Sequence, residues 1–243
     1  MIRNLFLSFF SKEKLHHTPW VINLNSRIIL TTTFLLLLFG TVFIYLFEYN
    51  GALKEHSTFG ALIEAFFISA NNRTAGFNTV DVSLISAPTL MICIFLMWIG
   101  ASPASTGGGI KTSTFAIAVL NIISLAKGKK RTEIYRRVIG EHSIRRAFAI
   151  IALSLLVLGI GIFLLVIVEP DKDLLTLAFE AFSAFSTVGQ SVNTTPNLSS
   201  AGKLIIIAMM FIGRVSMFSL LIAMMKREKY HNYQYPKEEI LIN

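Results

Sequence analysis

The sequence predicts an all-α polytopic membrane protein with two helix–re-entrant pore loop–helix repeats, in which the second helix of the first repeat is broken. One observation is composition. The 243 residues are 53% hydrophobic and 15% charged, with a mean hydropathy of +0.63, which leaves too little polar surface for a water-soluble globule. The other observation is an internal repeat, in which a polar segment with a Thr-x-Gly tripeptide precedes an apolar segment with Ile-Gly.

The two copies of this repeat lie 113 residues apart. Their tripeptides are Thr74-Ala75-Gly76 and Thr187-Val188-Gly189. In each copy a second glycine follows 24 residues after the first, at Gly100 and Gly213. A single Thr-x-Gly arises often by chance, but two copies in register indicate related units.

Apolar runs define the expected helices in order. Four runs are near or above the roughly 20 residues that a bilayer crossing needs: residues 28–47, 90–126, 148–168 and 204–225. Two shorter runs, residues 59–70 and 174–185, cannot span and have the length of a pore helix that enters the membrane and turns back. As one helix, residues 90–126 would be about 55 Å long, which exceeds one crossing, so a break within them is expected.

Basic residues predict the orientation. The N-terminal arm, the segment between the second and third spans and the tail hold 16 of the 22 Lys and Arg, so these segments are expected in the cytoplasm. The location that follows is the cell (plasma) membrane, multi-pass, with both termini cytoplasmic. The units are a cytoplasmic arm 1–26, a first repeat 27–126, a basic cytoplasmic linker 127–145, a second repeat 146–227 and a cytoplasmic tail 228–243.

The net charge of +8 is therefore mostly a topology signal. No aromatic–basic module accompanies it, so nucleic acid is not an expected partner, whereas the lipid bilayer is. The five His show no ligand spacing, and no Ser, His and Asp constellation with catalytic spacing lies in a span. We expect no enzyme, no cofactor and no metal other than a transported cation.

The Thr-x-Gly segments are the candidate ion filter. Successive backbone carbonyls can replace the hydration shell of a cation, and glycine permits the unusual dihedrals that such an array requires. The alternative is that these are ordinary loops between helices. The expected ligands are the carbonyl oxygens of Thr74, Ala75, Gly76 and Phe77 and of Thr187, Val188, Gly189 and Gln190.

The glycine-rich segment of residues 100–112 is the candidate gate. It breaks the second helix of the first repeat, and non-helical backbone at that depth must be enclosed by protein or face water. A phosphate-loop motif is excluded because Gly109-Ile110-Lys111-Thr112 lacks the adjacent Gly-Lys and no soluble βαβ unit surrounds it. Arg214 lies inside the last span and is expected to face the bundle interior. The gate residues are Gly107, Gly108, Gly109, Lys111 and Arg214.

Glu64 and Glu180 open the two copies as part of Glu-Ala-Phe. We expect them to start the two short helices, where a carboxylate interacts favourably with a helix N-terminus. At the outer mouth of the path they would also attract cations.

Five strings of this sequence resemble the Trk/Ktr/HKT potassium-uptake superfamily. The resemblance is to the C-terminal half, the third and fourth pore repeats, of a Ktr-type membrane subunit. The strings are residues 73–81 (RTAGFNTVD), 100–112 (GASPASTGGGIKT), 186–189 (STVG), 213–215 (GRV) and 235–242 (YPKEEILI).

The resemblance implies a pore of four repeats with one filter glycine each, an intramembrane gate loop and an Arg that faces it. Gly76, Gly189, Lys111 and Arg214 match these positions. It also implies K⁺ uptake and a cytosolic nucleotide-binding regulatory ring subunit, although anionic lipid would equally account for the basic inner face. An N-terminal-half subunit or a second copy would complete the pore. The alternative is a truncated, non-conducting remnant or scaffold that only binds partner subunits.

Overall fold

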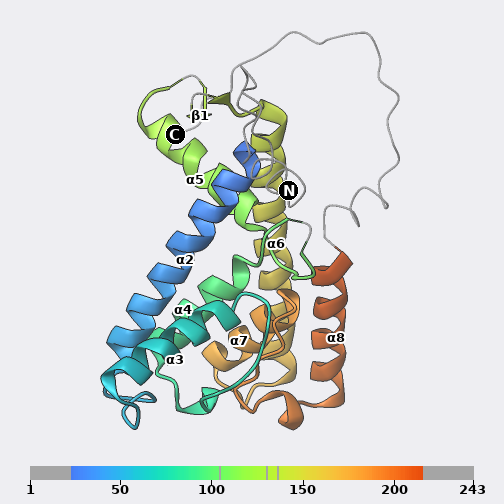
Figure 1. The fold of residues 1–243 in the computed structure, drawn as a ribbon. Helices are drawn as coiled ribbons and strands as arrows, with labels where there is room; N and C mark the ends of the chain where they lie inside the picture. The colour runs from blue at the N-terminus through green and yellow to red at the C-terminus, as the bar shows by residue number, and fades with distance from the viewer. Residues whose placement is uncertain (1–22, 104, 130, 136, 216–243) are drawn as a thin grey trace, which may run out of the picture.

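The computed structural model describes residues 23–215 except 104, 130 and 136. Most of the predicted N-terminal arm, the end of the fourth predicted span and the predicted tail lie outside these residues. Within them the chain is mostly helical (Figure 1).

The first repeat begins with α2 (Leu24–Glu48), a long apolar helix against which α3 (Thr58–Asn71) packs. The hydroxyl of Ser57 caps α3 by accepting a hydrogen bond from the N–H of Gly60 at 3.2 Å. A 3₁₀ turn, η1 (Val82–Leu84), then leads to α4 (Ala87–Trp98). The described residues between 99 and 111 form no helix, and α5 (Thr112–Ala126) follows them.

A short β-hairpin, β1 (Glu133–Ile134) and β2 (Arg137–Val138), follows α5. The sequence analysis did not predict it, because two-residue strands give no periodic signal. The hairpin leads into α6 (Glu141–Val168), which begins within the segment expected to be a linker. α6 is the first helix of the second repeat.

The second repeat continues with α7 (Leu174–Phe185), the 3₁₀ turn η2 (Thr195–Asn197) and α8 (Ser200–Val215). The side chain of Asp173 caps α7 by accepting the N–H of Leu175 at 3.1 Å. α7 packs on α4, α6 and α8, and α6 packs on α5, so the second repeat contacts the first through both its short helix and its long helix (Figure 1).

Within the part of the chain that the structure describes, two helices, α2 and α6, are long and apolar enough to cross a membrane on their own. Only 22% of the most apolar 18-residue window of each is buried inside the molecule, whereas the core helix of a soluble protein is mostly buried. Phe34 and Phe163 illustrate this, with 64% and 65% of their surface exposed. Exposed apolar faces of this size indicate a lipid or protein partner.

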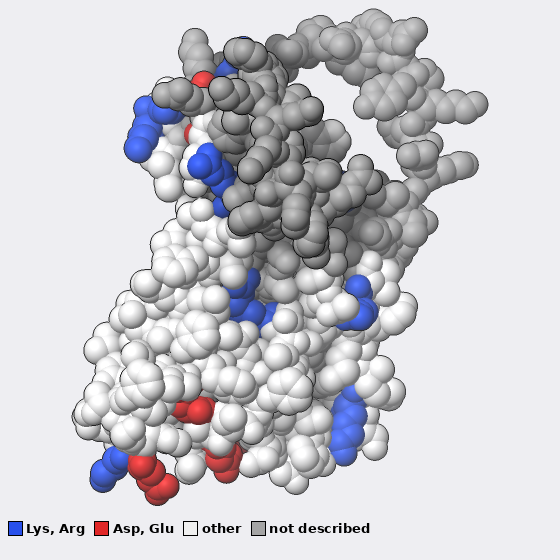
Figure 2. Space-filling view, viewed as in Figure 1, with Lys and Arg blue, Asp and Glu red and all other residues white. Residues whose placement is uncertain are grey.

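Charge is distributed unevenly along the long axis. In Figure 2 most of the visible acidic surface lies at the end opposite the hairpin. The hairpin end carries exposed basic residues, including Lys127, Lys129 and Arg131. The basic end contains the segment between the second and third predicted spans, whose Lys and Arg residues predicted the orientation.

Candidate functional site

The two Thr-x-Gly segments follow α3 and α7 and meet along one seam. Gly76 has φ +72° and Gly189 has φ +87°, dihedrals that L side chains rarely adopt. A Cβ placed on Gly76 would overlap the carbonyl oxygen of Val188. Glycine is therefore required at position 76 both by its dihedral and by the close approach of the second segment.

Side chains from both short helices hold the residue that follows each glycine. Asn71 Oδ1 accepts the N–H of Phe77 at 2.8 Å, and Asn71 Nδ2 donates to the Phe77 carbonyl. Gln190 Nε2 donates to the same carbonyl at 3.3 Å. In the second repeat Ser183 Oγ donates to the carbonyl of Gln190 at 2.6 Å.

Of the eight carbonyl oxygens predicted as ligands, two accept hydrogen bonds from side chains. The Phe77 carbonyl accepts two donors, which occupies both of its lone pairs, and the Gln190 carbonyl accepts one. In this conformation Phe77 does not present a free oxygen. The other six carbonyls accept no hydrogen bond within the described residues: those of Thr74, Ala75, Gly76, Thr187, Val188 and Gly189.

Gly189 differs from Gly76 in having no neighbouring segment against its Cα. A Cβ placed on Gly189 would meet no atom within 4 Å, and Gly189 and Ala75 are both exposed. Gly76 and Gly189 occupy equivalent positions, yet only Gly76 has a neighbouring segment against it. The two segments therefore contact each other at Gly76 and leave Gly189 open.

The non-helical segment between α4 and α5 doubles back on itself. Ile99 and Ile110 form a parallel bridge, in which the N–H of Ile110 donates to the carbonyl of Trp98 at 3.2 Å. The N–H of Thr112 donates to the carbonyl of Ala101 at 3.3 Å. The two ends of the segment are thus held together, and the glycines lie in the loop between them.

The three glycines of this loop lie against both Thr-x-Gly segments. The N–H of Gly108 donates to the carbonyl of Ser186 at 3.1 Å and to Thr187 Oγ1 at 2.6 Å. A Cβ on Gly107 would overlap the methyl group of Thr74. The structure therefore brings the predicted gate residues into contact with the predicted filter.

Three cations surround the loop and bind its carbonyls. Arg214 Nη1 donates to Thr106, and Lys111 Nζ donates to Gly107. Arg73, buried at 6% exposure, donates to the carbonyl of Gly100 at 3.2 Å. None of the three forms an ion pair among the described residues, so backbone dipoles compensate their charge. The sequence analysis did not assign Arg73 a role, although its place beside the first tripeptide was a usable signal.

The expectation that Glu64 and Glu180 start the short helices is wrong. Each is the seventh residue of its helix, α3 and α7. Glu64 accepts the hydroxyl of Thr79, and Glu180 accepts that of Thr195 at 2.5 Å, so both carboxylates bind a residue 15 positions downstream. Because Glu180 is only 3% exposed and accepts this bond, its carboxylate holds the segment that leaves the second tripeptide.

Glu180 has two further donors in that segment. Ser191 Oγ donates to Glu180 Oε1, as does the N–H of Val192 at 3.1 Å. A buried carboxylate that accepts several hydrogen bonds is well compensated, and it fixes the backbone that donates to it.

Two other carboxylates, which the sequence analysis missed, tie the helices of each repeat together. Glu48, at the end of α2, accepts the N–H and the hydroxyl of Ser86 at 2.9 and 2.5 Å. Glu169, which follows α6, accepts the N–H of Ser199 at 2.7 Å. Ser86 and Ser199 directly precede α4 and α8. The sequence signal that could have identified them is an acidic residue directly after each of the apolar runs 28–47 and 148–168.

Comparison with known proteins agrees with this architecture. Residues 5–234 match the family described as "TrkH: Cation transport protein". The chain is 36% identical over 226 residues to "Ktr system potassium uptake protein D" of Bacillus subtilis (strain 168), and this alignment covers 93% of the chain and 50% of the relative. It is 37% identical over 235 residues to "Potassium/sodium uptake protein NtpJ" of Enterococcus hirae, with 93% and 52% covered.

The fold is similar to that of the potassium transporter TrkH from Vibrio parahaemolyticus. The TM-score is 0.67 at 19% identity, and the match covers 91% of this chain and 48% of the other. The chain spans about half the length of the curated relatives it matches. It belongs to the TrkH family of cation transport proteins.

Proposed function

We propose that this chain forms half of a potassium-conducting path across the cell membrane. The observation that carries the proposal is the seam between the two Thr-x-Gly segments, where six carbonyl oxygens are without a hydrogen-bond donor among the described residues. Such carbonyls can replace the water around K⁺ without a charged side chain that would trap the ion. The names of the relatives as potassium or potassium/sodium uptake proteins support K⁺ as the cargo.

The path requires a membrane, and the exposed apolar faces of α2 and α6 support one. The chain would be multi-pass, with the basic hairpin end and both termini in the cytoplasm. The acidic residues of the opposite end would then face outward and concentrate cations there.

The filter would be completed by further segments around its open flank. The empty space beside Gly189 is where a segment equivalent to residues 187–189 would lie if the contact at Gly76 were repeated. An N-terminal half, in the same or another polypeptide, or a second copy of this chain could supply it.

The glycine loop would act as the gate. It lies directly against the filter through Gly108, and Lys111 and Arg214 bind its carbonyls. Two positive charges beside the path oppose K⁺ by Coulomb repulsion, which is strong where water is scarce. Glycine-rich backbone can change arrangement at low conformational cost, so the loop could move aside.

A cytosolic nucleotide-binding ring subunit would regulate the path from the inner face. The support for this part is the dense basic surface at the hairpin end, together with the family resemblance. Retention of such a subunit by the purified chain would test it.

The second candidate is a non-conducting scaffold, which the open flank of Gly189 favours for the chain alone. A bacterial strain that lacks potassium uptake separates the two. We expect growth at low K⁺ and Rb⁺ uptake when this chain is co-expressed with an N-terminal half of a relative, and loss of both when Gly76→Ser is introduced. Equal growth with the parent and Gly76→Ser chains, at equal membrane expression, would favour the scaffold.

A further inference from the structure

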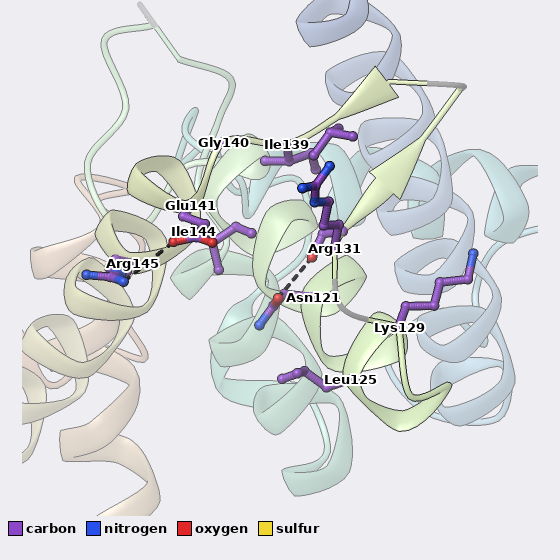
Figure 3. Close-up of a pocket in the computed structure, with 11 residues that line it drawn as sticks. Asn121, Leu125, Lys129, Arg131, Ile139, Gly140, Glu141, Ile144 and Arg145 are labelled. Atoms are coloured by element: carbon purple, nitrogen blue, oxygen red, sulfur yellow. Dashed lines mark hydrogen bonds and ion pairs between the residues drawn. The ribbon is translucent and has the colours of Figure 1, made fainter. Parts of the chain in front are cut away.

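We propose that the basic pocket between α5, the hairpin and α6 binds the headgroup of an anionic phospholipid. The pocket is a hollow of about 490 Å³, within the range of roughly 300–1,000 Å³ that is typical of small-ligand sites. Figure 3 shows it beneath the hairpin, with Lys129 and Arg145 at opposite edges in this view and Arg131 between them. It is separate from the filter and the gate.

The pocket combines cations with exposed apolar side chains. Lys129, Arg131 and Arg145 surround it, while Leu125 and Val138 line it with 65% and 53% of their surface exposed. A free phosphate ion would need only the cations. A phospholipid would use both, because its phosphate pairs with the cations and its glycerol and first methylenes contact the apolar residues.

Charge in the pocket favours an anion. Glu141 is the one carboxylate among the described lining residues, and its Oε2 is 3.5 Å from Nη2 of Arg145 on the same helix. Lys129 and Arg131 form no ion pair among the described residues. The pocket therefore carries a net positive charge, and clusters of this kind at the cytoplasmic ends of membrane helices bind anionic headgroups.

The depth of the pocket matches a headgroup if the proposed orientation holds. Arg145 and Arg146 directly precede the apolar run of α6, and Lys127 directly follows the apolar helix α5. Basic residues at such transitions lie at the membrane surface. The pocket would thus face the inner leaflet where phosphates lie, and a soluble regulator would need to reach below the surface to fill it.

Hydrogen bonds hold the pocket in shape before any ligand binds. Ser124 Oγ donates to the carbonyl of Arg131 at 3.0 Å, and Thr132 Oγ1 donates to Asn121 Oδ1 at 2.9 Å. The carbonyl of Ser124 also accepts a hydrogen bond from the N–H of Lys129 at 3.0 Å. These bonds attach the loop and the hairpin to α5, so binding does not have to order them.

The test is lipid retention by the full chain. The chain is purified in mild detergent, titrated with phosphatidylglycerol or phosphatidylcholine, and its bound lipid is counted by native mass spectrometry. We expect Arg131→Gln and Lys129→Gln each to weaken phosphatidylglycerol binding about fivefold, which corresponds to about 1 kcal/mol per basic residue. Glu141→Gln should strengthen it, since a negative charge leaves the pocket.

Lys127→Gln is the matched control, because Lys127 is an exposed cation directly after α5 but does not line the pocket. It should leave binding unchanged. Equal losses in the pocket and control variants would overturn the proposal in favour of diffuse surface charge. Unchanged lipid binding with loss of a co-expressed regulatory subunit would overturn it in favour of a protein-docking site. Neither readout depends on K⁺ flux, so failure of the proposed function would be seen separately.

Discussion

Gln190 and Phe77 hold equivalent positions in the two repeats, 113 residues apart, and a hydrogen bond of 3.3 Å from Gln190 Nε2 to the Phe77 carbonyl joins them. The bond crosses the seam directly after Gly76 and Gly189. Together with the Asn71 side chain, it fixes the exit of the first segment. The two candidate filter segments are thus held by side chains as well as by packing.

Gln190→Ala removes this cross-repeat bond. We expect it to lower stability by about 1 kcal/mol, the usual net value of a neutral hydrogen bond, and to reduce K⁺/Na⁺ discrimination because the first segment gains freedom. Thermal unfolding and competitive Rb⁺ and Na⁺ uptake measure the two effects. Gln190→Glu should lower stability and discrimination further, since it places a second acceptor against the Phe77 carbonyl. Unchanged discrimination in both variants would show that the bond does not position the filter.

Gly76 and Gly189 should respond differently to serine. Both have positive φ, so each substitution should cost about 1–2 kcal/mol of backbone strain. Gly76→Ser also forces a side chain against the Val188 carbonyl, whereas Gly189→Ser meets open space. We therefore expect the chain alone to lose more stability with Gly76→Ser. In a completed pore the two should be equally harmful to K⁺ selectivity. Continued tolerance of Gly189→Ser there would argue against a ring that repeats the seam.

The lengths and order of the apolar runs predicted most of the architecture. Apolar runs of defined length predicted α2, α3, α6 and α7, and the length argument predicted the interruption before Thr112. The family resemblance is confirmed by the match over residues 5–234. The helices and the interruption could be predicted because helix rise and bilayer thickness directly constrain the length of an apolar segment.

Side-chain partners could not be predicted in this way. Glu180 was expected at a helix start, but it lies mid-helix and binds Thr195, since the boundary of α7 depends on the cap at Asp173. The saturation of the Phe77 carbonyl required knowing that Asn71 and Gln190 converge on it. Such contacts depend on how two repeats pack together, which no spacing within one repeat reveals.

Glu180 and Glu64 form a natural matched pair. Glu180 is 3% exposed and has donors from Ser191, Val192 and Thr195, whereas Glu64 is half-buried and binds Thr79. Glu180→Gln replaces one acceptor oxygen by a donor, and we expect it to cost about 1.5–3 kcal/mol, the range for hydrogen bonds to charged groups. Glu64→Gln should cost less. Thermal unfolding of both variants at neutral pH tests the order, and the opposite order would refute the role given to Glu180.

Glu169 predicts a pH dependence. The hydroxyl and the N–H of Ser199 lower the pKa of the Glu169 carboxyl below its usual value of 4.5. A carboxyl with a lowered folded-state pKa stabilises the protein above its unfolded pKa, and this contribution is lost as the pH falls through the folded pKa. The difference in melting temperature between the parent and Glu169→Gln should therefore be largest near neutral pH and shrink below about pH 4.5. A difference that stays constant from pH 7 to pH 4 would contradict it.

Arg214 tests the gate. Its side chain binds the Thr106 carbonyl at the edge of the glycine loop, and Lys111 binds Gly107 beside it. Arg214→Ala removes one anchor of the loop and one positive charge from the proposed path. We expect K⁺ flux to rise severalfold at equal expression, because both changes lower the barrier to a cation. Deletion of Gly107–Gly109 should raise it as well.

Lys203→Ala is the control for Arg214, since Lys203 lies on the same helix and binds the Pro196 carbonyl at 3.1 Å. It removes one positive charge from α8 and, among the described residues, no hydrogen bond to the glycine loop. Rb⁺ uptake into vesicles that hold the completed pore compares the variants. If Arg214→Ala and the deletion conduct no faster than the parent and Lys203→Ala while remaining folded and inserted, the loop is a packing element. A rise confined to the first two variants supports a gate that Arg214 holds closed against the filter.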